Sequence, residues 1–150
     1  METVFLKSKV LWAQIDANMH LRHSAYADFA AQARVEMLES LGMTASVMQQ
    51  KMIGPILFRE ESIYYKEIKL GDYVQVTCSL LKCRVDGSRW SFVQEIYNQN
   101  DVLAAKVNVD GAWIDMKARK LTAPPPDFNE KFLKDLPKAE NFVLEPVPVK

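Results

Sequence analysis

One long amphipathic helix is the feature that most constrains the fold of this chain. From Ser24 to Leu41, apolar residues recur at steps of three and four, which places them on one face of a helix. Ser24 is expected to cap the start of this helix, and Gly42 is a stop signal after its end. The apolar stripe consists of Tyr26, Phe29, Ala30, Ala33, Met37, Leu38 and Leu41. A single stripe has to be buried against another element of structure.

The remaining residues mostly show strand patterns. A first strand is expected over residues 3–15, before the helix, and residues 43–52 form a connection with room for a short helix. Turn signals at Gly71-Asp72 and Asp86-Gly87 separate the later strands. These later strands are expected over 57–68, 73–84, 89–97 and 102–109, with a last strand continuing through Ala112–Met116. A strand, one helix and an antiparallel meander predict an α+β fold in which the sheet packs on the helix.

The C-terminal part begins with a proline cluster, Pro124–Pro126, which is expected to end the sheet because proline cannot donate to a ladder. Residues 1–126 are therefore expected to form the domain. Residues 127–150 are expected to be a tail packed on the same domain as one short helix. The apolar residues of this tail are Phe128, Phe132, Leu133 and Leu136.

Composition excludes several classes of function. The 150 residues suit one domain, and 19 basic and 19 acidic residues give no net charge that would favour nucleic acid or an anionic membrane. No apolar run reaches the ~20 residues that span a bilayer, and residues 1–30 lack a signal-peptide core. Cys78 and Cys83 read as reduced structural residues. A cytoplasmic location without membrane insertion is expected.

The chemically informative segment lies between the first strand and the helix. Asp16, His20 and His23 fall within eight residues, and Tyr26 follows in the first turns of the helix. Unpaired backbone N–H groups at a helix start can hold a developing negative charge. A carboxylate beside them can act as a general base or as a nucleophile towards an acyl carbon. No other segment concentrates so many reactive groups.

At these residues the chain resembles the 4-hydroxybenzoyl-CoA thioesterase family of hotdog proteins. The family pattern places an Asp at the end of the first strand, then a Gly, a His, Tyr or Asn position, and a Tyr opening the long helix. Two departures are Met19, where the family usually has Gly, and Arg22, where an Asn is customary. The matching residues are Asp16, His20, His23, Tyr26, the run Ala33–Leu38 (ARVEML), Val109-Asp110 and the basic, proline-rich exit Arg119–Pro126.

The resemblance implies a hotdog fold and hydrolysis of acyl-CoA thioesters, with CoA as part of the substrate and no further cofactor or metal. It implies that Asp16 is the base or nucleophile and that N–H groups at His23 and Ser24 polarise the carbonyl. Such proteins are homodimers or homotetramers whose site lies between subunits. The residues expected to contact substrate are His20, Tyr26, Met19, Arg89, Arg119 and Lys120.

Phosphate groups of CoA call for cations at the rim of the site. Arg84 and Arg89 flank the predicted hairpin turn, and Lys117, Arg119 and Lys120 follow the last strand. Taken one at a time, each of these residues is better interpreted as a solvated surface charge. The chain has no Walker or dinucleotide-binding glycine pattern.

Each candidate also has a purely structural interpretation. Aspartate is common in turns at strand ends, which would explain Asp16. His20 is explained equally well as a polar residue of the loop. Tyr26 falls on the buried stripe of the helix. Two histidines and a carboxylate form a ligand set for iron, but all three would have to converge from one short segment. Metal binding is therefore not expected.

Two rival functions remain open. A hotdog dehydratase or hydratase sets a His against an acidic residue from another element, whereas His23 and Asp16 share one loop. A non-catalytic acyl-CoA or lipid-binding module would account for Met19 and Arg22 as signs of lost catalysis.

Overall fold

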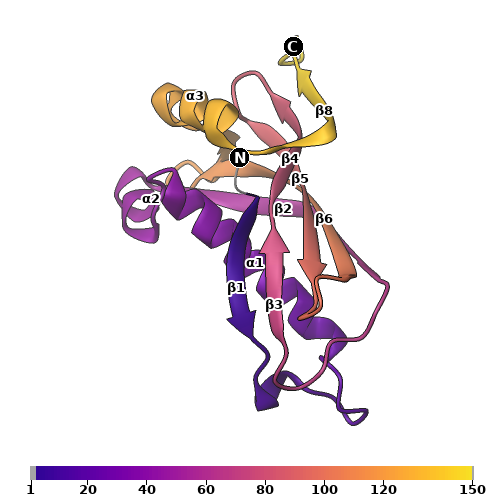
Figure 1. The fold of residues 1–150 in the computed structure, drawn as a ribbon. Helices are drawn as coiled ribbons and strands as arrows, with labels where there is room; N and C mark the ends of the chain where they lie inside the picture. The colour runs from indigo at the N-terminus through magenta and orange to yellow at the C-terminus, as the bar shows by residue number, and fades with distance from the viewer. Residues whose placement is uncertain (1–2, 150) are drawn as a thin grey trace.

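The computed structural model describes residues 3–149 and is shown as a ribbon in Figure 1. In chain order its elements are β1 (Val4–Lys9), the 3-10 helix η1 (Trp12–Gln14), α1 (His23–Ser40), α2 (Ala45–Lys51), β2 (Ile53–Tyr64), β3 (Tyr73–Thr77), β4 (Ser79–Arg84), β5 (Arg89–Tyr97), β6 (Leu103–Asp115), β7 (Lys120–Thr122), α3 (Pro126–Asp135) and β8 (Lys138–Glu145). One long helix and a largely antiparallel sheet confirm the predicted α+β class.

Helix α1 carries the predicted stripe. Seven of its residues are buried, among them Ala25, Ala30 and Ala33, which have no exposed surface. The helix begins at His23 after an extended Arg22, so the prediction that Ser24 is the N-cap was wrong by two positions. Its end was predicted correctly: Gly42 has a φ of +83°, which favours glycine at this position.

Strand β5 lies at the centre of the sheet. On one side it pairs with β6, and on the other with β3 and then β4, which form one row interrupted at Cys78. Strand β1 continues the sheet beyond β3, and β2 pairs only with β6. All of these pairings are antiparallel; only β4 and β8 run parallel. Strand β2 is therefore an edge of the sheet along its whole length.

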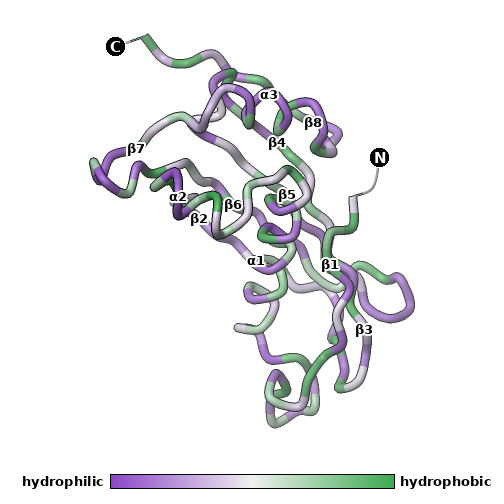
Figure 2. Tube along the Cα trace, turned by 90° about the vertical axis from the view of Figure 1, so that its left-hand side faces the viewer, coloured by the Kyte–Doolittle hydropathy of each residue, from purple (hydrophilic) through white to green (hydrophobic). Residues whose placement is uncertain are grey.

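The core lies between α1 and the sheet, with α1 behind β1 and β3 in Figure 1. Aromatic side chains extend this core to α3. Phe128 packs edge-on against Trp113 at 5.4 Å between ring centroids, and Phe132 against Phe92 at 5.9 Å. Figures 1 and 2 both place α3 and β8 at one end of the molecule, far from the loop between β1 and α1. In Figure 2 the hydropathy of the chain changes repeatedly along each strand and helix.

Strand boundaries differ from the sequence prediction in several places; β2 ends at Tyr64 rather than 68, and the predicted strand 73–84 is divided into β3 and β4. The first strand ends at Lys9 rather than at residue 15, because Leu11 N–H donates to Oε1 of Gln14 at 2.8 Å and the chain turns into η1. Strand β2 begins at Ile53, before the predicted 57, although it contains Pro55. Proline is tolerated there because β2 is an edge strand.

The two predicted last strands are one continuous strand, β6, which passes through Gly111. The six-membered ring of Trp90 lies over this glycine. A Cβ at position 111 would lie 2.3 Å from a ring carbon of Trp90 and 2.4 Å from the carbonyl oxygen of Ile56. The absence of a side chain at 111 therefore allows Trp90 to lie flat on β6.

The prediction that the proline cluster ends the sheet was wrong. The short helix expected in the tail is present as α3, with Phe128 and Phe132 buried, but β8 then adds a further strand beside β4. Leu80 N–H donates to the carbonyl of Pro137, and Val85 N–H to that of Glu145. Backbone bonds hold β8, whose side chains are largely exposed and show no alternation that would reveal it. The boundary at residue 126 between domain and tail stays a prediction.

Both cysteine thiols are free and buried, and burial raises the pKa of Cys78 and of Cys83 to about 12. Thiols with such a pKa are poor nucleophiles at neutral pH. Within residues 3–149 no helix is long and apolar enough to cross a membrane, and no three His, Cys, Asp or Glu side chains are grouped as metal ligands.

Replacing Gly111 by Ala is expected to destabilise the protein by about 1–3 kcal/mol, because the new methyl group overlaps Trp90 and the Ile56 carbonyl. Gly54→Ala on the neighbouring strand is the matched control. A Cβ at position 54 meets only the end of Met116, at 4.0 Å, so that variant should equal or slightly exceed the wild type in stability. Urea unfolding of the three proteins measures the difference, and equal stabilities would contradict the proposed contact.

Candidate active site

The Asp16 loop is a closed turn between η1 and α1. A bridge between Ile15 and Leu21 joins its two ends, and Asp16 N–H donates to the His20 carbonyl at 2.9 Å. Oδ1 of Asp16 accepts hydrogen bonds from the N–H groups of Asn18 at 2.9 Å and His20 at 3.2 Å. Within residues 3–149, Oδ2 has no hydrogen-bond donor. One carboxylate oxygen thus holds the loop, and the other is free for chemistry.

Met19 has a φ of +63° at the tip of this loop. This is the left-handed region, which costs an L-residue other than glycine roughly 1–2 kcal/mol. The finding explains why glycine is usual at the matching position of the family that the sequence resembles. The Met19 side chain is half exposed and is not part of the pocket wall described below.

The first turn of α1 offers free donors beside the loop. Ala25 N–H donates to the Arg22 carbonyl at 3.0 Å, whereas the N–H groups of His23 and Ser24 have no acceptor in the described part of the chain. Arg22 holds this turn against η1. Its N–H donates to the Gln14 carbonyl at 2.8 Å, and its guanidinium donates to the Ala13 carbonyl and to Oγ of Ser24. The customary Asn is thus replaced by a residue that anchors the helix entrance.

An open pocket of about 360 Å³ lies in front of Asp16 and the helix start. Tyr64, at the end of β2, donates its hydroxyl to the His23 carbonyl at 3.3 Å. Its ring packs edge-on against Tyr26, with centroids 5.0 Å apart. The residues that line the pocket are Asp16, His20, Leu21, His23, Tyr26, Tyr64, Tyr65, Lys66 and Glu67.

Tyr26 is buried in the helix stripe, as the sequence indicates, and still contributes to the pocket wall. Burial is the main cause that raises its pKa, and Tyr64, Asp16 and Glu67 raise it further through their charges. The phenol therefore stays protonated at neutral pH.

The structure brings together four of the sequence-predicted site residues: Asp16, His20, His23 and Tyr26. Ser24 is adjacent through its backbone N–H, while its Oγ accepts from Arg22. Sequence reasoning missed the residues from the end of β2 and the loop after it: Tyr64, Tyr65, Lys66 and Glu67. The sequence signal for them is the adjacent pair Tyr64 and Tyr65. Successive side chains of a strand point to opposite faces, so the two tyrosines cannot both lie on the buried face.

Three predicted substrate contacts lie elsewhere in the chain. Lys120 pairs with Asp115, which pairs with Ile53 at the start of β2. From there to Tyr64 the strand runs 11 residue steps, or about 36 Å. Arg119, in the turn before Lys120, is equally remote. Within a single chain these cations do not meet the Asp16 pocket.

Arg89 also lies away from Asp16. It pairs with Ala112, opposite Ile56, about 26 Å along β2 from Tyr64. Its guanidinium lies 4.6 Å from the centroid of the Phe58 ring, a cation–π contact. A hollow of about 220 Å³ at this place also contains Lys82 and Arg84. The structure thus gathers three cations near one another, at a distance from the carboxylate.

Comparison with known proteins identifies the family. Residues 10–132 match the thioesterase-like superfamily, and the chain belongs to it. A search of curated proteins found no match.

Solved structures share the fold at low sequence identity. SAV2348 from Staphylococcus aureus, solved in complex with CoA, is 18% identical with a TM-score of 0.81, over 100% of this chain and 91% of its own. The DHNA-CoA thioesterase of the same organism is 21% identical with a TM-score of 0.80, covering 88% and 89%. Slr0204 from Synechocystis, a 1,4-dihydroxy-2-naphthoyl-CoA thioesterase, is 15% identical with a TM-score of 0.78, covering 89% and 98%.

These findings confirm the predicted hotdog fold and the predicted class, a thioester hydrolase. The match is to the thioesterase-like superfamily as a whole. It gives no preference for the 4-hydroxybenzoyl group, the acyl group of the family that the sequence resembles.

Two variants at the loop tip test the backbone strain at Met19. Met19→Gly and Met19→Ala both remove the side chain beyond Cβ, but only glycine, which also lacks Cβ, adopts a φ of +63° without a steric cost. The glycine variant should therefore be the more stable of the two by about 1 kcal/mol. Thermal unfolding measures this difference. An alanine variant as stable as the glycine variant would show that position 19 is not held in this conformation.

Proposed function

We propose that this protein hydrolyses acyl-CoA thioesters and that Asp16 is its catalytic carboxylate. One observation carries the proposal: a carboxylate with a free oxygen and a helix start with two free N–H groups border the same open pocket. The first group can activate or perform an attack on an acyl carbon. The second can hold the oxyanion that the attack creates.

Two routes use these groups. As a general base, Asp16 takes a proton from water while the water oxygen attacks the thioester carbonyl carbon. As a nucleophile, its Oδ2 attacks that carbon, and water later hydrolyses the resulting anhydride. In both routes the carbonyl oxygen becomes an oxyanion that accepts hydrogen bonds from the N–H groups of His23 and Ser24. The C–S bond then breaks, and CoA leaves as a thiolate that takes up a proton.

Several contacts support accurate positioning of these groups. Asn18 and His20 fix Asp16 through Oδ1, so Oδ2 does not rotate away from the pocket. Tyr64 and Arg22 both hold the first turn of α1, through the His23 carbonyl and Oγ of Ser24. Such preorganised donors are often the largest single contribution to catalysis of acyl transfer.

CoA as the carrier of the acyl group is supported by the relatives. One structure with this fold was solved with CoA, and two others are CoA thioesterases by name. Lys66 is a cation that lines the Asp16 pocket itself. The remoter cations Arg89, Arg119 and Lys120 reach a CoA molecule only if a second chain brings them to Asp16.

A homodimer paired along β2 would do this. Among residues 3–149 no strand pairs with the outer edge of β2, which is 12 residues long. If two such edges pair in antiparallel fashion, the Ile53 end of one lies beside the Tyr64 end of the other. The cations of one protomer would then approach the Asp16 pocket of its partner. We include a dimer, or a tetramer built from two of them, in the proposed function, together with a cytoplasmic location consistent with the unpaired thiols.

Asp16→Asn is the decisive variant. Asparagine can accept the same hydrogen bonds from Asn18 and His20 but has neither charge nor basicity. Thioesterase turnover should fall at least roughly a hundredfold, with the melting temperature nearly unchanged. A release assay for the CoA thiol, run on a panel of acyl-CoAs, measures it.

Asp115→Asn is the matched control for this experiment. Oδ1 of Asp115 also accepts two backbone N–H groups, from Lys117 and Ala118, at the far end of β6. Its turnover should fall far less than that of Asp16→Asn, because Asp115 stands beside the cations Arg119 and Lys120 and so acts at most on CoA binding. An Asp16→Asn protein as active as the control would refute the mechanism. A wild type that binds CoA esters tightly without releasing thiol would favour the non-catalytic binding module instead.

The oligomeric state is the next test. The 17.2 kDa chain exposes the edge of β2 and apolar side chains on it, with Phe58 half exposed. Exposed edges and apolar patches of this kind favour association. Light scattering at micromolar concentration should give at least twice the monomer mass. A mass of one chain would remove the argument that cations of a partner complete the site.

A further inference from the structure

Arg22 occupies the last position before helix α1, with an extended backbone (φ −65°, ψ 147°). Its guanidinium donates to two neutral acceptors, the Ala13 carbonyl and Oγ of Ser24, the second at 2.9 Å from Nε. The residue is half-buried, and within residues 3–149 it forms no ion pair. A fixed positive charge without a paired carboxylate therefore lies at the start of the helix.

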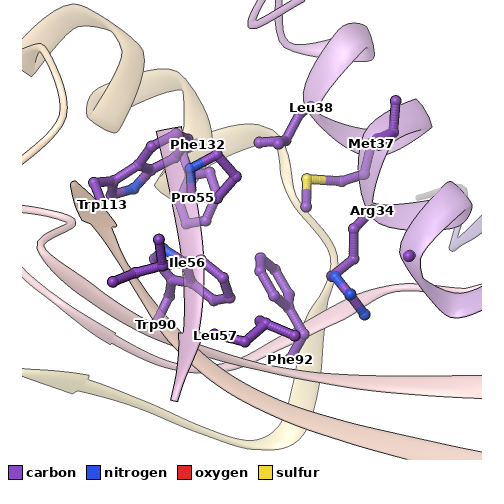
Figure 3. Close-up of a pocket in the computed structure, with 12 residues that line it drawn as sticks. Arg34, Met37, Leu38, Pro55, Ile56, Leu57, Trp90, Phe92, Trp113 and Phe132 are labelled. Atoms are coloured by element: carbon purple, nitrogen blue, oxygen red, sulfur yellow. The ribbon is translucent and has the colours of Figure 1, made fainter. Parts of the chain in front are cut away.

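Two other arginines of the chain have carboxylate partners. Figure 3 shows Arg34, which extends from α1 into the wall of a largely apolar cavity of about 190 Å³. Its guanidinium lies 3.8 Å from the carboxylate of Glu60, and that of Arg59 on β2 lies 3.0 Å from Glu61. Purely neutral partners are thus a particular property of Arg22 and not a general one of the arginines in this fold.

The position of Arg22 is unfavourable for a cation in the free protein. Aligned peptide dipoles place partial positive charge at the N-terminus of a helix, so a cation there is repelled and an anion is attracted. The first turn of α1 contains no acidic residue that would offset this partial charge. A negative charge that arrives at this turn is therefore attracted both by the helix dipole and by Arg22.

The guanidinium lies close to the proposed oxyanion donors. Nε of Arg22 is 2.9 Å from Oγ of Ser24, and a serine separates its own Oγ and N by less than about 4 Å. The charge is therefore within roughly 7 Å of the Ser24 N–H, which has no acceptor in the described part of the chain. An oxygen bound to that N–H would lie within about 10 Å of the charge.

We propose that Arg22 is a positioning residue whose charge also stabilises the oxyanion formed at the N–H groups of His23 and Ser24. The inference rests on the proposed thioester hydrolysis. In the ground state the thioester carbonyl is neutral and gains little from the charge of Arg22. In the transition state its oxygen becomes negative and gains more, which is the condition for a rise in kcat. Arg22 in place of the customary asparagine then strengthens catalysis and is no sign of its loss.

Two substitutions of Arg22 separate its charge from its anchoring of the turn. Arg22→Gln places Nε2 where arginine has Nε, so it keeps the donor to Ser24 Oγ but has no charge. Arg22→Lys keeps the charge without the planar fork. In a thiol-release assay, kcat of Arg22→Gln should be lower by roughly tenfold, the effect of a unit charge at this range with an effective dielectric constant of about 20. KM should change little, and Arg22→Lys should recover most of the loss.

Lys131→Gln on α3 is the matched control. It removes one positive charge from an exposed position at the opposite end of the molecule (Figure 1) and should keep the wild-type turnover. Thermal unfolding checks that each variant is folded. A kcat of Arg22→Gln equal to that of Lys131→Gln would overturn the proposal. Equal losses in Arg22→Gln and Arg22→Lys would also overturn it, because anchoring of the turn alone would then explain them.

A binding measurement tests the same charge without turnover. In Asp16→Asn the pocket lacks the carboxylate that would repel an anion, so hexanoate can place its carboxylate at the helix start. In an NMR titration the amide resonances of His23 and Ser24 should shift. Adding Arg22→Gln should raise the dissociation constant at least about fivefold, whereas adding Lys131→Gln should leave it unchanged.

The titration also separates this inference from the proposed function. No shift of the two amides, or an unchanged dissociation constant with Arg22→Gln, would contradict the role of Arg22 even if the wild type hydrolyses thioesters. An inactive wild type whose helix start still binds hexanoate through Arg22 would refute the proposed hydrolysis and leave the electrostatic role of Arg22 standing.

Discussion

Close packing of α1 on the sheet is the constraint on which the rest of the structure depends. Three of its buried residues, Ala25, Ala30 and Ala33, are alanines without exposed surface, so the helix backbone can approach the strands closely. A larger residue at any of them would push the helix away from β5 and β6. The position of α1 also determines where its first turn lies, and with it the free N–H groups of His23 and Ser24.

The same packing explains why the two ends of α1 have different surroundings. At the N-terminal end the helix emerges beside the last residues of β2, where polar and aromatic side chains form an open pocket around Asp16. Towards the C-terminal end it covers the start of β2 and the aromatic cluster that reaches α3, leaving a largely apolar cavity beside Arg34. One helix thus separates an open, polar pocket around Asp16 from a largely apolar cavity beside Arg34.

Sequence reasoning succeeded where the determinants are local. The stripe of α1, its stop at Gly42 and the turn at Gly87 depend on neighbouring residues, and the structure has each of them. The cluster of Asp16, His20 and His23 is local as well, since a loop of this length keeps them together. Strand β8 could not be predicted, because backbone pairing with β4 holds it and its side chains show no alternation.

Contacts between distant segments were equally hidden. The fit of Trp90 on Gly111 and the bond between Arg34 and Gln94 depend on strand register and on the placement of α1 over the sheet. The contribution of Tyr64 to the Asp16 pocket arises because β2 ends beside the helix start, 41 residues later in the chain. None of these pairings leaves a periodic pattern in the sequence, so only the folded chain reveals them.

The separation between carboxylate and cations is the last physical constraint to account for. A CoA ester carries its reactive carbon at one end and its phosphates at the other, and a site for it must offer suitable groups at both. In one chain the ladder between β2 and β6 keeps Arg119 and Lys120 about 36 Å from Tyr64. No side-chain rotation spans that distance, whereas the proposed antiparallel association along the outer edge of β2 would reverse the direction of the second strand and bring the cations of one protomer to the Asp16 pocket of the other. The length of β2 separates Asp16 from Arg119 and Lys120 within one protomer. Pairing of two protomers along the outer edges of β2 would bring the two kinds of group together across the interface.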